Sequence, residues 1–596
     1  MAYAACPHGQ YISSVTFASF GLSTGTCGAF SANPSCNADA TSAARTACLY
    51  QASCSVPATT KLYGDPCPGF AKNLTLQVGC SIGEGNVLSA TLHVDGAKIS
   101  SIPAGFVGYN HEFGLISIDT KDPAFHTATA LVKPGTMRWP GGLSIAYYNT
   151  RSGCFDLGSP TDTAQNGQWG NGVTFWRCYA MGPSFLADAV ALASSAGAVG
   201  LVVEINVNHD SPQNAGAFVA ANKAAGYPVL LYELGNEPSF QTCFANNVIY
   251  CASGARPTNE EYLTAMKPFA DAIHAADPNA KVSITFPSYG SSATYPAYSS
   301  LDIWQTWVAG GNPIYWQYVT MHFYPSVPAT VTDYDHTPFY NAILYSTTDS
   351  PTTAIDNIRT VMTEMNGGVG PTSLGSCMWD ATWLTEFAGR VAKANQTDYM
   401  QIWPLADGAN IGMRGPLGDQ VVYDQLVTDI GRRIFSNQSG ILPINMSNVG
   451  AVYWANPVSI GWSLFSSQAK SSTLPATLIL GGPVVDVDFG AGVVAQMAAL
   501  YATVFVPNDG SPRSVVLSNK HNASATIIDV SAAAPGIPVR QITTVSAVDP
   551  FTVHTSPNTA VDSRGNAVPY VVPVVTSGGD ATAVLVPANG VVRVDF

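Results

Sequence analysis

The sequence predicts a multi-domain chain: a (β/α)8 barrel, a C-terminal β-sandwich and a small, disulfide-rich N-terminal α/β domain. Three observations predict this arrangement. Seven of the twelve cysteines lie before residue 81, a density typical of a disulfide framework. Apolar runs alternate with Ala-rich amphipathic stretches from residue 85 to about 460, as in α/β domains. From 461 to 596, short β-type runs separated by turn residues follow one another without a helical pattern.

Residues 1–82 form the first expected domain. They contain FASFG, TCG, GDPC and a closing VGC, and they resemble galactose/rhamnose-binding lectin domains of sea-urchin-egg type, in the form appended to plant β-galactosidases. The resemblance implies the disulfides Cys6–Cys80, Cys36–Cys67 and Cys48–Cys54. It leaves Cys27 without a partner, because the extra N-terminal cysteine of the animal lectins is missing here.

Sugar binding by this domain is an open question. The glutamate beside the missing cysteine and the Tyr-Gly-Arg triplet that help such lectins hold sugar are absent, and FASFG stands in their place. Asp65 and Lys72 are retained. The sequence therefore predicts the lectin fold and leaves two alternatives, a galactose- or rhamnose-binding module and a non-binding spacer.

The barrel is expected within residues 86–460. Seven apolar runs rich in β-branched or aromatic residues indicate buried parallel strands, and they begin at residues 106, 135, 199, 227, 280, 315 and 449. A barrel needs an eighth strand, which the gap between the last two runs must supply. The run NVLSATLHVDG (86–96) is expected to be a strand of the sandwich, whose main part is 461–596.

Two Thr-Glu dipeptides, at Glu364 and Glu386, compete for the end of the seventh strand. Apolar residues spaced by three and four before Glu364, with a threonine cap and a stop at Gly367-Gly368, predict an amphipathic helix. The run ATWLTEFAG predicts a buried strand over 381–388, with VGAVYWANP as strand eight. The alternative makes VMTEMN the strand, the segment around Glu386 a helix, and YMQIWPLAD strand eight. The first interpretation is preferred because it keeps the alternation of strands and helices.

Asn236 and Glu237 directly follow the expected fourth strand, where a barrel presents its functional groups. Together with FVGYNHEF, MRWPGGLSIAYYN and the trailing β domain, the YELGNEP motif resembles family 79 of the glycoside hydrolases. This retaining family of clan-A barrels includes β-glucuronidases and heparanase-like enzymes. The resemblance implies Glu237 as acid/base and Glu386 as nucleophile of a double displacement. No P-loop, dinucleotide fingerprint or cysteine–histidine metal spacing occurs, so no cofactor or metal is expected.

The same resemblance assigns roles around these glutamates. Arg138, ending strand two, is expected to keep the nucleophile ionised, with a structural ion pair as the alternative. Asn236 is expected to contact the sugar 2-hydroxyl, and His322 and Tyr324, ending strand six, to hydrogen-bond the nucleophile or the sugar. Trp454 is expected to offer an apolar platform to a sugar face. A core histidine and a core tryptophan are the simpler interpretations of His322 and Trp454.

The resemblance implies a retaining β-glycosidase, with β-glucuronides as the favoured substrates of β-glucuronidase type. Arg390, Lys393 and Arg414 lie in the loop expected after Glu386 and are candidates to bind a glucuronate carboxylate. A clan-A β-glucanase, or a β-galactosidase or galactanase of cell-wall glycans, is the alternative enzyme. An inactive carbohydrate-binding cell-wall protein is the alternative of another class.

Composition limits the partners of the chain. The 25 Lys and Arg residues against 39 Asp and Glu give a net charge of −14, which disfavours nucleic acid and polysulfated glycans. No uninterrupted apolar stretch reaches the length of about 18 residues that a membrane span requires. The expected partner is a carbohydrate: a glycan or small glycoside in the barrel, with a galactose- or rhamnose-containing glycan as a second candidate at the lectin-like domain.

Secretion to the cell exterior or cell wall is expected from the cysteines. Two further disulfides, Cys154–Cys178 and Cys243–Cys251, are expected to staple loops at the strand ends, which leaves Cys377 odd. The start MAYAACPHGQ is no signal peptide, and we expect that the first Met replaces a natural signal. Glycosylation sequons begin at Asn73, Asn395, Asn437, Asn445 and Asn522.

Overall fold

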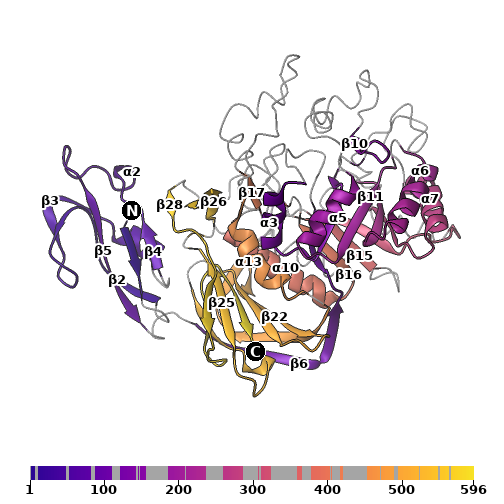
Figure 1. The fold of residues 1–596 in the computed structure, drawn as a ribbon. Helices are drawn as coiled ribbons and strands as arrows, with labels where there is room; N and C mark the ends of the chain where they lie inside the picture. The colour runs from indigo at the N-terminus through magenta and orange to yellow at the C-terminus, as the bar shows by residue number, and fades with distance from the viewer. Residues whose placement is uncertain are drawn as a thin grey trace, which may run out of the picture.

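Eight parallel strands close into a barrel in the computed structural model of the protein, which Figure 1 draws as a ribbon. The structure describes residues 2–6, 11–48, 53–81, 88–110, 121–142, 145, 148–155, 185–207, 210–236, 259–285, 307, 310–323, 359–365, 377–402, 405, 417–419, 453–469, 471–488, 494–521, 524–547, 549, 551–556, 558–562 and 566–596. The barrel strands are β7 (Val107–Asn110), β8 (Thr136–Trp139), β11 (Gly200–Ile205), β12 (Val229–Leu234), β13 (Val282–Thr285), β14 (Tyr318–Phe323), β15 (Arg359–Met365) and β16 (Thr397–Ile402). They follow one another around the ring in chain order, and β16 pairs with β7 to close it. The carboxyl ends of all eight strands therefore meet at one mouth.

The first six barrel strands lie where the sequence predicts them. Their apolar composition has a physical cause, since each strand is covered by the barrel interior on one side and by helices on the other. In β11, for example, all the residues GLVVEI are buried. The helices described around the barrel are α3 (Pro123–Leu131), α5 (Leu186–Ser195), α6 (Pro212–Ala224) and α7 (Asn259–Ala276).

The predictions for strands seven and eight are wrong. The seventh strand is β15, which contains Glu364, and the segment around Glu386 is the helix α10 (Met378–Ala394). The eighth strand is β16, which lies within the run that the rejected alternative proposed. The structure therefore agrees with that alternative.

The error at α10 has a physical reason. Residues 378 to 389 of this helix are all buried, so no polar face marks its helical period. The helix packs against α13 (Pro457–Ser466) and against strands of the sandwich, and Figure 1 shows both helices between the sandwich and the barrel. A side chain at Gly389 would collide with Tyr501 and Thr503, which shows how closely the helix approaches the sandwich.

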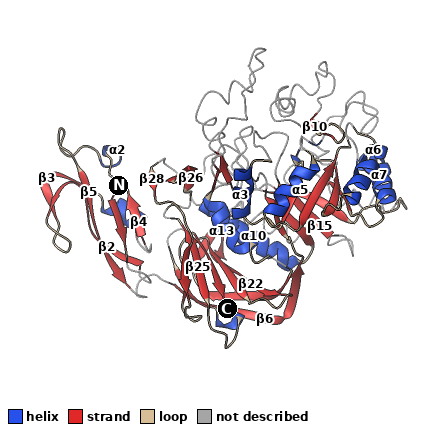
Figure 2. Cartoon of the chain, in the orientation of Figure 1, coloured by secondary structure: helices blue, strands red, loops and turns tan. Residues whose placement is uncertain are grey.

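The sandwich is built on a nine-stranded sheet in the order β29-β25-β31-β23-β22-β19-β6-β24-β30. Its strands are β6 (Leu88–Ile102), β19 (Ser472–Gly481), β22 (Leu500–Pro507), β23 (Ser514–Asn519), β24 (Thr526–Asp529), β25 (Gln541–Ser546), β29 (Val574–Ser577), β30 (Val584–Val586) and β31 (Gly590–Asp595). The strand β6 precedes the barrel in sequence and pairs with β19 and β24 (Figure 2). The barrel is thus inserted between a first strand of this sheet and the rest of it.

The prediction that Trp454 lies on barrel strand eight is also wrong. Trp454 belongs to β18 (Tyr453–Ala455), which pairs with β17 (Leu417–Asp419) in a separate two-stranded sheet. Its indole N–H donates to Asn456 Oδ1 and to the carbonyl of His554, both at 3.2 Å. Trp454 is buried among these groups, on the side of the C-terminal domain.

The N-terminal domain stands to one side of the sandwich in Figure 1. It contains the sheet β3-β2-β5, formed by Ser31–Asp39, Tyr11–Thr24 and Asn73–Ser81, the pair β1 (Ala2–Ala5) and β4 (Ser53–Val56), and the helices α1 (Thr41–Cys48) and α2 (Thr60–Tyr63). The disulfides Cys36–Cys67 and Cys48–Cys54 are formed as predicted. Cys6 is disulfide-bonded, while the side chain of its expected partner Cys80 lies outside the described residues.

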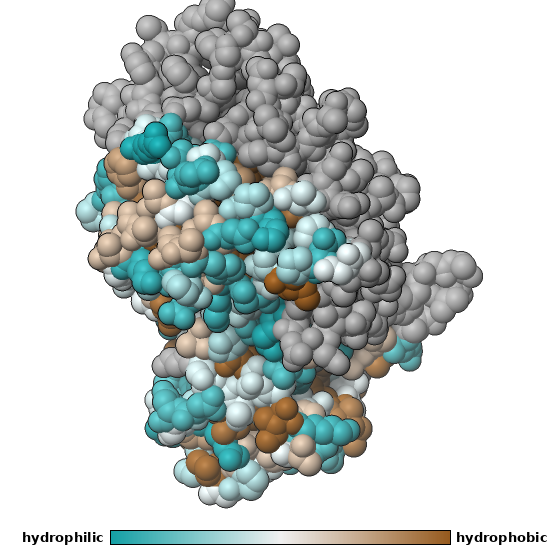
Figure 3. Space-filling view, turned by 90° about the vertical axis from the view of Figure 1, so that its right-hand side faces the viewer, coloured by the Kyte–Doolittle hydropathy of each residue, from teal (hydrophilic) through white to brown (hydrophobic). Residues whose placement is uncertain are grey.

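One face of the molecule is drawn in space-filling form in Figure 3. In the face that Figure 3 shows, hydrophilic and hydrophobic residues are interspersed. No helix in the part of the chain that the structure describes is long and apolar enough to cross a membrane.

Candidate active site

Arg138, at the end of β8, is the centre of a buried cluster at the barrel mouth. Its Nε donates to Glu233 Oε2 at 2.8 Å, and its Nη1 donates to Glu364 Oε1 at 2.6 Å. Its Nη2 donates to Glu204 Oε1 at 2.6 Å, to Asn236 Oδ1 at 2.7 Å and to Glu233 Oε1 at 3.0 Å. The guanidinium is fully buried, so one cation serves three carboxyl groups from β11, β12 and β15.

Glu364 is the carboxyl of this cluster that extends furthest toward solvent, with 5% of its surface exposed against 1% for Glu204 and 0% for Glu233. Besides Arg138, Asn110 Nδ2 lies 3.4 Å from Glu364 Oε1, and His322 Nδ1 lies 3.3 Å from Oε2. The structure thus brings Arg138 and His322 to Glu364 rather than to Glu386.

The surroundings shift the pKa values of the groups in this cluster in different directions. Burial opposes the charged form of Arg138, but the three carboxylates outweigh it and raise the pKa of the guanidinium well above its ordinary value. Burial, opposed by Arg138 and reinforced by the neighbouring carboxylates, raises the pKa of Glu204 well above its usual range. Burial acts on Glu233 too, but Arg138 and His322 outweigh it and lower the pKa of Glu233. The same surroundings therefore shift the pKa values of Glu204 and Glu233 in opposite directions.

The end of β12 is fixed by its neighbours. Tyr262 donates through its hydroxyl to the Leu234 carbonyl at 3.1 Å and accepts from the Thr285 N–H at 2.9 Å. Thr285 Oγ1 donates to the Gly235 carbonyl at 3.1 Å. These bonds hold the turn that carries Asn236, whose Oδ1 faces Arg138. Glu237 comes next in the chain.

Several predicted site residues lie outside the described part of the chain. These are Glu237, Tyr324, Arg414, Cys178, Cys243 and Cys251, together with the side chain of Cys154. Trp403, which follows β16 directly in the sequence, also lies outside it.

Glu386 occupies a different part of the molecule. Its Oε1 accepts from Arg390 Nε at 2.8 Å, and its Oε2 contacts the ammonium of Lys520, a residue of the sandwich domain. Lys393, further along α10, donates to Thr477 Oγ1 at 2.5 Å and to the Ala502 carbonyl at 2.9 Å. Arg390 and Lys393 therefore face the sandwich, and the prediction that they form a cationic loop after strand seven is wrong.

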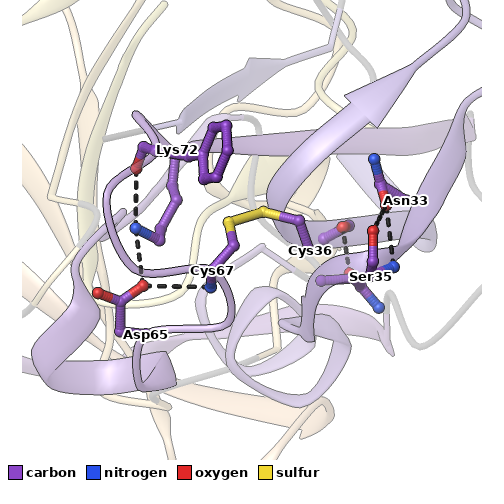
Figure 4. The surroundings of a disulfide bond; sticks show 9 residues. Asn33, Ser35, Cys36, Asp65, Cys67 and Lys72 are labelled. Carbon is purple, nitrogen blue, oxygen red and sulfur yellow. Dashed lines mark hydrogen bonds and ion pairs between the residues drawn. A yellow bond between two sulfur atoms is a disulfide. The ribbon is translucent and has the colours of Figure 1, made fainter.

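Asp65 and Lys72 meet in the N-terminal domain (Figure 4). Lys72 Nζ lies 2.7 Å from Asp65 Oδ1 and donates to the Phe70 carbonyl at 2.8 Å. Asp65 also accepts from the Cys67 N–H at 3.2 Å, beside the Cys36–Cys67 disulfide. Cys27 is an exposed free thiol of this domain, and Cys377 is a buried thiol whose pKa is raised by burial.

Sequence reasoning missed Glu204 and Glu233 as members of the cluster. A signal for both was present, since each is a carboxylate in an otherwise apolar strand, in VVEIN and LYELG, close to the carboxyl end. A buried carboxylate in such a place requires a cation or several donors, and Arg138 was the available cation.

Comparison with known proteins divides the chain in two. Residues 4–80 match the family described as D-galactoside/L-rhamnose binding SUEL lectin domain. This part is 40% identical over 77 residues to beta-galactosidase 6 of Oryza sativa subsp. japonica, covering 13% of this chain and 9% of that protein. It is 39% identical over 72 residues to beta-galactosidase 8 of Arabidopsis thaliana, covering 12% of this chain and 8% of that protein. The similarity thus spans less than a tenth of those relatives.

The remainder is similar in fold to solved glycoside hydrolases. A GH51 arabinofuranosidase from Xanthomonas axonopodis pv. citri superposes with a TM-score of 0.57 at 14% identity, over 85% of this chain and 99% of that one. The family 51 α-L-arabinofuranosidase AbfB from Bifidobacterium longum gives a TM-score of 0.58 at 12% identity, over 85% and 99%. A 4-O-α-L-rhamnosyl-β-D-glucuronidase from Fusarium oxysporum gives 0.52 at 14% identity, over 85% and 100%. The predicted fold class, a barrel with a β-sandwich and a small lectin domain, is confirmed.

Proposed function

We propose that the protein is a retaining β-glycoside hydrolase in which Glu364 is the nucleophile and Glu237 the acid/base. The observation that carries the proposal is the position of Glu364. It lies at the carboxyl end of the seventh barrel strand, in contact with Arg138 and His322, and Arg138 also holds Asn236, the residue before Glu237. A double displacement requires two carboxyl groups that flank the scissile bond, and the resemblance to clan-A barrels implies that they follow strands four and seven.

In this mechanism the Glu364 carboxylate attacks the anomeric carbon while Glu237 gives its proton to the departing oxygen. A covalent glycosyl ester on Glu364 results. Glu237 then removes a proton from water, and the water attacks the same carbon and releases the sugar with its original configuration. Arg138 and Asn110, which contact Glu364 Oε1, orient the carboxylate for the attack.

A β-glucuronide remains the first proposed substrate. The sequence resemblance to family 79 supports it, and one protein of similar fold is named a rhamnosyl-glucuronidase. A glucuronate carboxylate requires a cation or several donors. Arg414 is the candidate that remains for this role, because Arg390 and Lys393 bond on the sandwich side.

A neutral β-glycoside, such as a β-galactoside or β-glucoside, is the second candidate. One observation favours it: at the described part of the mouth, Arg138 is fully buried and bonded to three carboxyl groups, so it offers nothing to an anionic sugar. The same carboxyl groups would repel a glucuronate. The glucuronide candidate therefore requires a cation from outside the described part of the chain to bind the sugar carboxylate, whereas the neutral candidate requires none.

The lectin-like domain is proposed to bind galactose- or rhamnose-containing glycans through the surface around Asp65 and Lys72. The family match and the retained pair support this role. The disulfides support a location in an oxidising compartment, for which secretion is the proposed route. Retention of the full chain on immobilised galactose or rhamnose, lost in Asp65→Ala, tests the binding. If the wild-type protein and the Asp65→Ala variant both eluted in the void volume, the lectin-like domain would be a spacer that binds no sugar.

A panel of 4-nitrophenyl glycosides tests the enzymatic proposal. It should include β-glucuronide, β-galactoside, β-glucoside and α-L-arabinofuranoside, with the anomeric configuration of the first product followed by proton NMR. Fastest release from the β-glucuronide supports the first candidate, and fastest release from a neutral β-glycoside supports the second. Product of inverted configuration would contradict the mechanism. No hydrolysis of any glycoside would favour an inactive carbohydrate-binding protein.

A further inference from the structure

Glu204 is a buried carboxyl group at the barrel mouth to which the proposed mechanism gives no task. It lies near the end of β11 and is 1% exposed. Both of its oxygens are engaged by N–H donors. Oε1 accepts from Arg138 Nη2 at 2.6 Å, and Oε2 accepts from the Gly141 N–H at 2.7 Å.

The contact with Gly141 fixes the turn that follows Arg138 in the chain. Gly141 and Gly142 have φ angles of 85° and 67°, a left-handed conformation that favours glycine. Both are buried, and neither has a side chain with which to hold this part of the turn. Glu204 therefore joins the side chain of Arg138 to the backbone three residues later, across the end of β8.

Arg138 can transmit the position of Glu204 to Glu364. A guanidinium is planar and rigid, so the direction of one N–H edge determines the direction of the others. The Nη2 edge points to Glu204, Glu233 and Asn236, whereas Nη1 points to Glu364. Loss of the shortest of the Nη2 contacts, that with Glu204, allows the group to turn toward Glu233 and away from Glu364.

We propose that Glu204 is a positioning residue of the active site, which holds Arg138 and the Gly141 turn so that Glu364 is aimed at the anomeric carbon. The inference rests on the proposed function, because it requires that Glu364 be the nucleophile. It goes beyond that function by adding a third carboxyl group whose effect on turnover is indirect.

The substitution Glu204→Gln removes one of the two acceptor oxygens with little change in the size of the side chain. A carboxyl group keeps lone pairs on both oxygens whether or not it carries a proton, whereas an amide nitrogen only donates. The glutamine can therefore accept from Arg138 or from Gly141, but not from both. Glu204→Asp is the second variant, since it keeps two acceptor oxygens on a shorter side chain and should recover part of the loss.

Glu386→Gln is the matched control. It is the same substitution of a buried glutamate that pairs with cations, but it lies at the interface of α10 with the sandwich. A general loss of stability would affect both variants, and a positioning effect only the first.

The experiment measures kcat and KM for each variant on the best glycoside of the panel, with a 2,4-dinitrophenyl and a 4-nitrophenyl leaving group. Misplacing the nucleophile should lower kcat of Glu204→Gln by about 10- to 100-fold on both substrates, because both require the attack. Glu386→Gln should melt at a lower temperature with kcat unchanged. Glu204→Asp should lie between wild type and Glu204→Gln.

Three results would overturn the inference. Turnover of Glu204→Gln equal to wild type would show that Glu204 does not position Glu364, and the proposed function would survive. A loss confined to the poorer leaving group would place the effect on proton donation instead. A wild-type protein inert on every glycoside would refute the proposed function, and this inference with it.

Discussion

The two Thr-Glu dipeptides of this chain lie in different elements, Glu364 in barrel strand β15 and Glu386 in helix α10. Glu364 and Glu386 are both buried and both contact cations. The threonine before each shows the difference in setting. Thr363 donates to Glu233 at 3.2 Å, across the barrel, whereas Thr385 donates to the Ala381 carbonyl at 2.8 Å, one turn back in its own helix.

The number of cations per carboxyl group separates the two sites. Glu386 has Arg390 on one oxygen and Lys520 on the other, so its charge is fully compensated. Glu364 shares Arg138 with two further carboxyl groups. A compensated buried pair has a structural role, while a crowded carboxylate that shares one cation is typical of an active site. The dipeptide sequence is the same, and the surroundings determine the role.

The strongest test of this comparison is Glu364→Gly. We expect turnover to fall by on the order of 10⁴-fold or more, since no nucleophile remains to form the glycosyl ester. Azide should enter the vacated space and give a glycosyl azide of inverted configuration, detectable by NMR. Glu386→Gly on the same substrate is the control, and it should neither abolish turnover in folded protein nor respond to azide. An essential Glu386 beside a dispensable Glu364 would reverse the comparison.

Glu237→Ala completes this test by removing the proposed acid/base. An activated leaving group needs little protonation, so the glycosyl ester should still form and azide should give product of retained configuration. If the Glu237→Ala variant formed no glycosyl ester from a 2,4-dinitrophenyl glycoside, the proposed role of Glu237 as acid/base would be contradicted.

The next largest effect is expected from Arg138→Lys. An ammonium group keeps the charge but is a point donor, and it cannot serve the acceptors that the guanidinium fork reaches. We expect kcat to fall by about 100-fold and the protein to lose about 3 kcal/mol of stability, because buried carboxyl groups lose their donors. Steady-state kinetics and urea unfolding measure the two effects. Wild-type kinetics in this variant would show that charge alone suffices.

Six of the barrel strands could be predicted from sequence because the segments that follow them in the chain are clearly polar loops or amphipathic helices. Short apolar runs are followed by polar residues and then by helices with solvent-exposed faces, as in β11 followed by α6. The seventh and eighth strands could not, because residues 378 to 389 of α10 are all buried, and the helix packs against α13, the sandwich and barrel strand β16. A helix without a polar face looks like a strand in sequence, and the packing that hides it is set by residues a hundred positions away.

The site was predictable to the same extent. Arg138 and Asn236 follow from their places at strand ends, and the structure does bring them together. The position of the second glutamate could not be deduced, because it depended on the strand assignment. The role predicted for Trp454 depended on the same strand assignment. Because that assignment was wrong, Trp454 lies on β18 instead of on the eighth barrel strand.

A smaller effect on turnover is expected from Glu386→Gln, which tests the structural side of the comparison through stability. Burial lowers the pKa of Lys520, and its ammonium form depends on the adjacent carboxylate. Removing one partner of a buried pair costs about 3–5 kcal/mol. Chemical denaturation should show this loss while kcat remains that of wild type. Undiminished stability would mean that the pair contributes nothing at the junction of α10 and the sandwich.

The smallest effect is expected from Asp380→Asn, in the first turn of α10. Neither carboxyl oxygen of Asp380 has a hydrogen-bond partner among the described residues, in contrast to Glu386 on the same helix. Burial raises the pKa of Asp380 well above its usual range, so the folded protein holds a proton there that the unfolded chain releases above pH ~4.

Stability therefore falls as pH rises above the unfolded pKa of about 4, because the folded state binds more protons than the unfolded state. Asparagine has nothing to ionise, so the variant should match wild type near pH 3.5 and exceed it by about 1 kcal/mol or more at pH 7. Urea unfolding at the two pH values measures the difference, and kcat is the control, since Asp380 makes no hydrogen bond to the described residues of the Arg138 cluster. A variant less stable than wild type at pH 7 would show that the Asp380 carboxylate is ionised and paired. The contrast between a compensated Glu386 and an uncompensated Asp380 would then disappear.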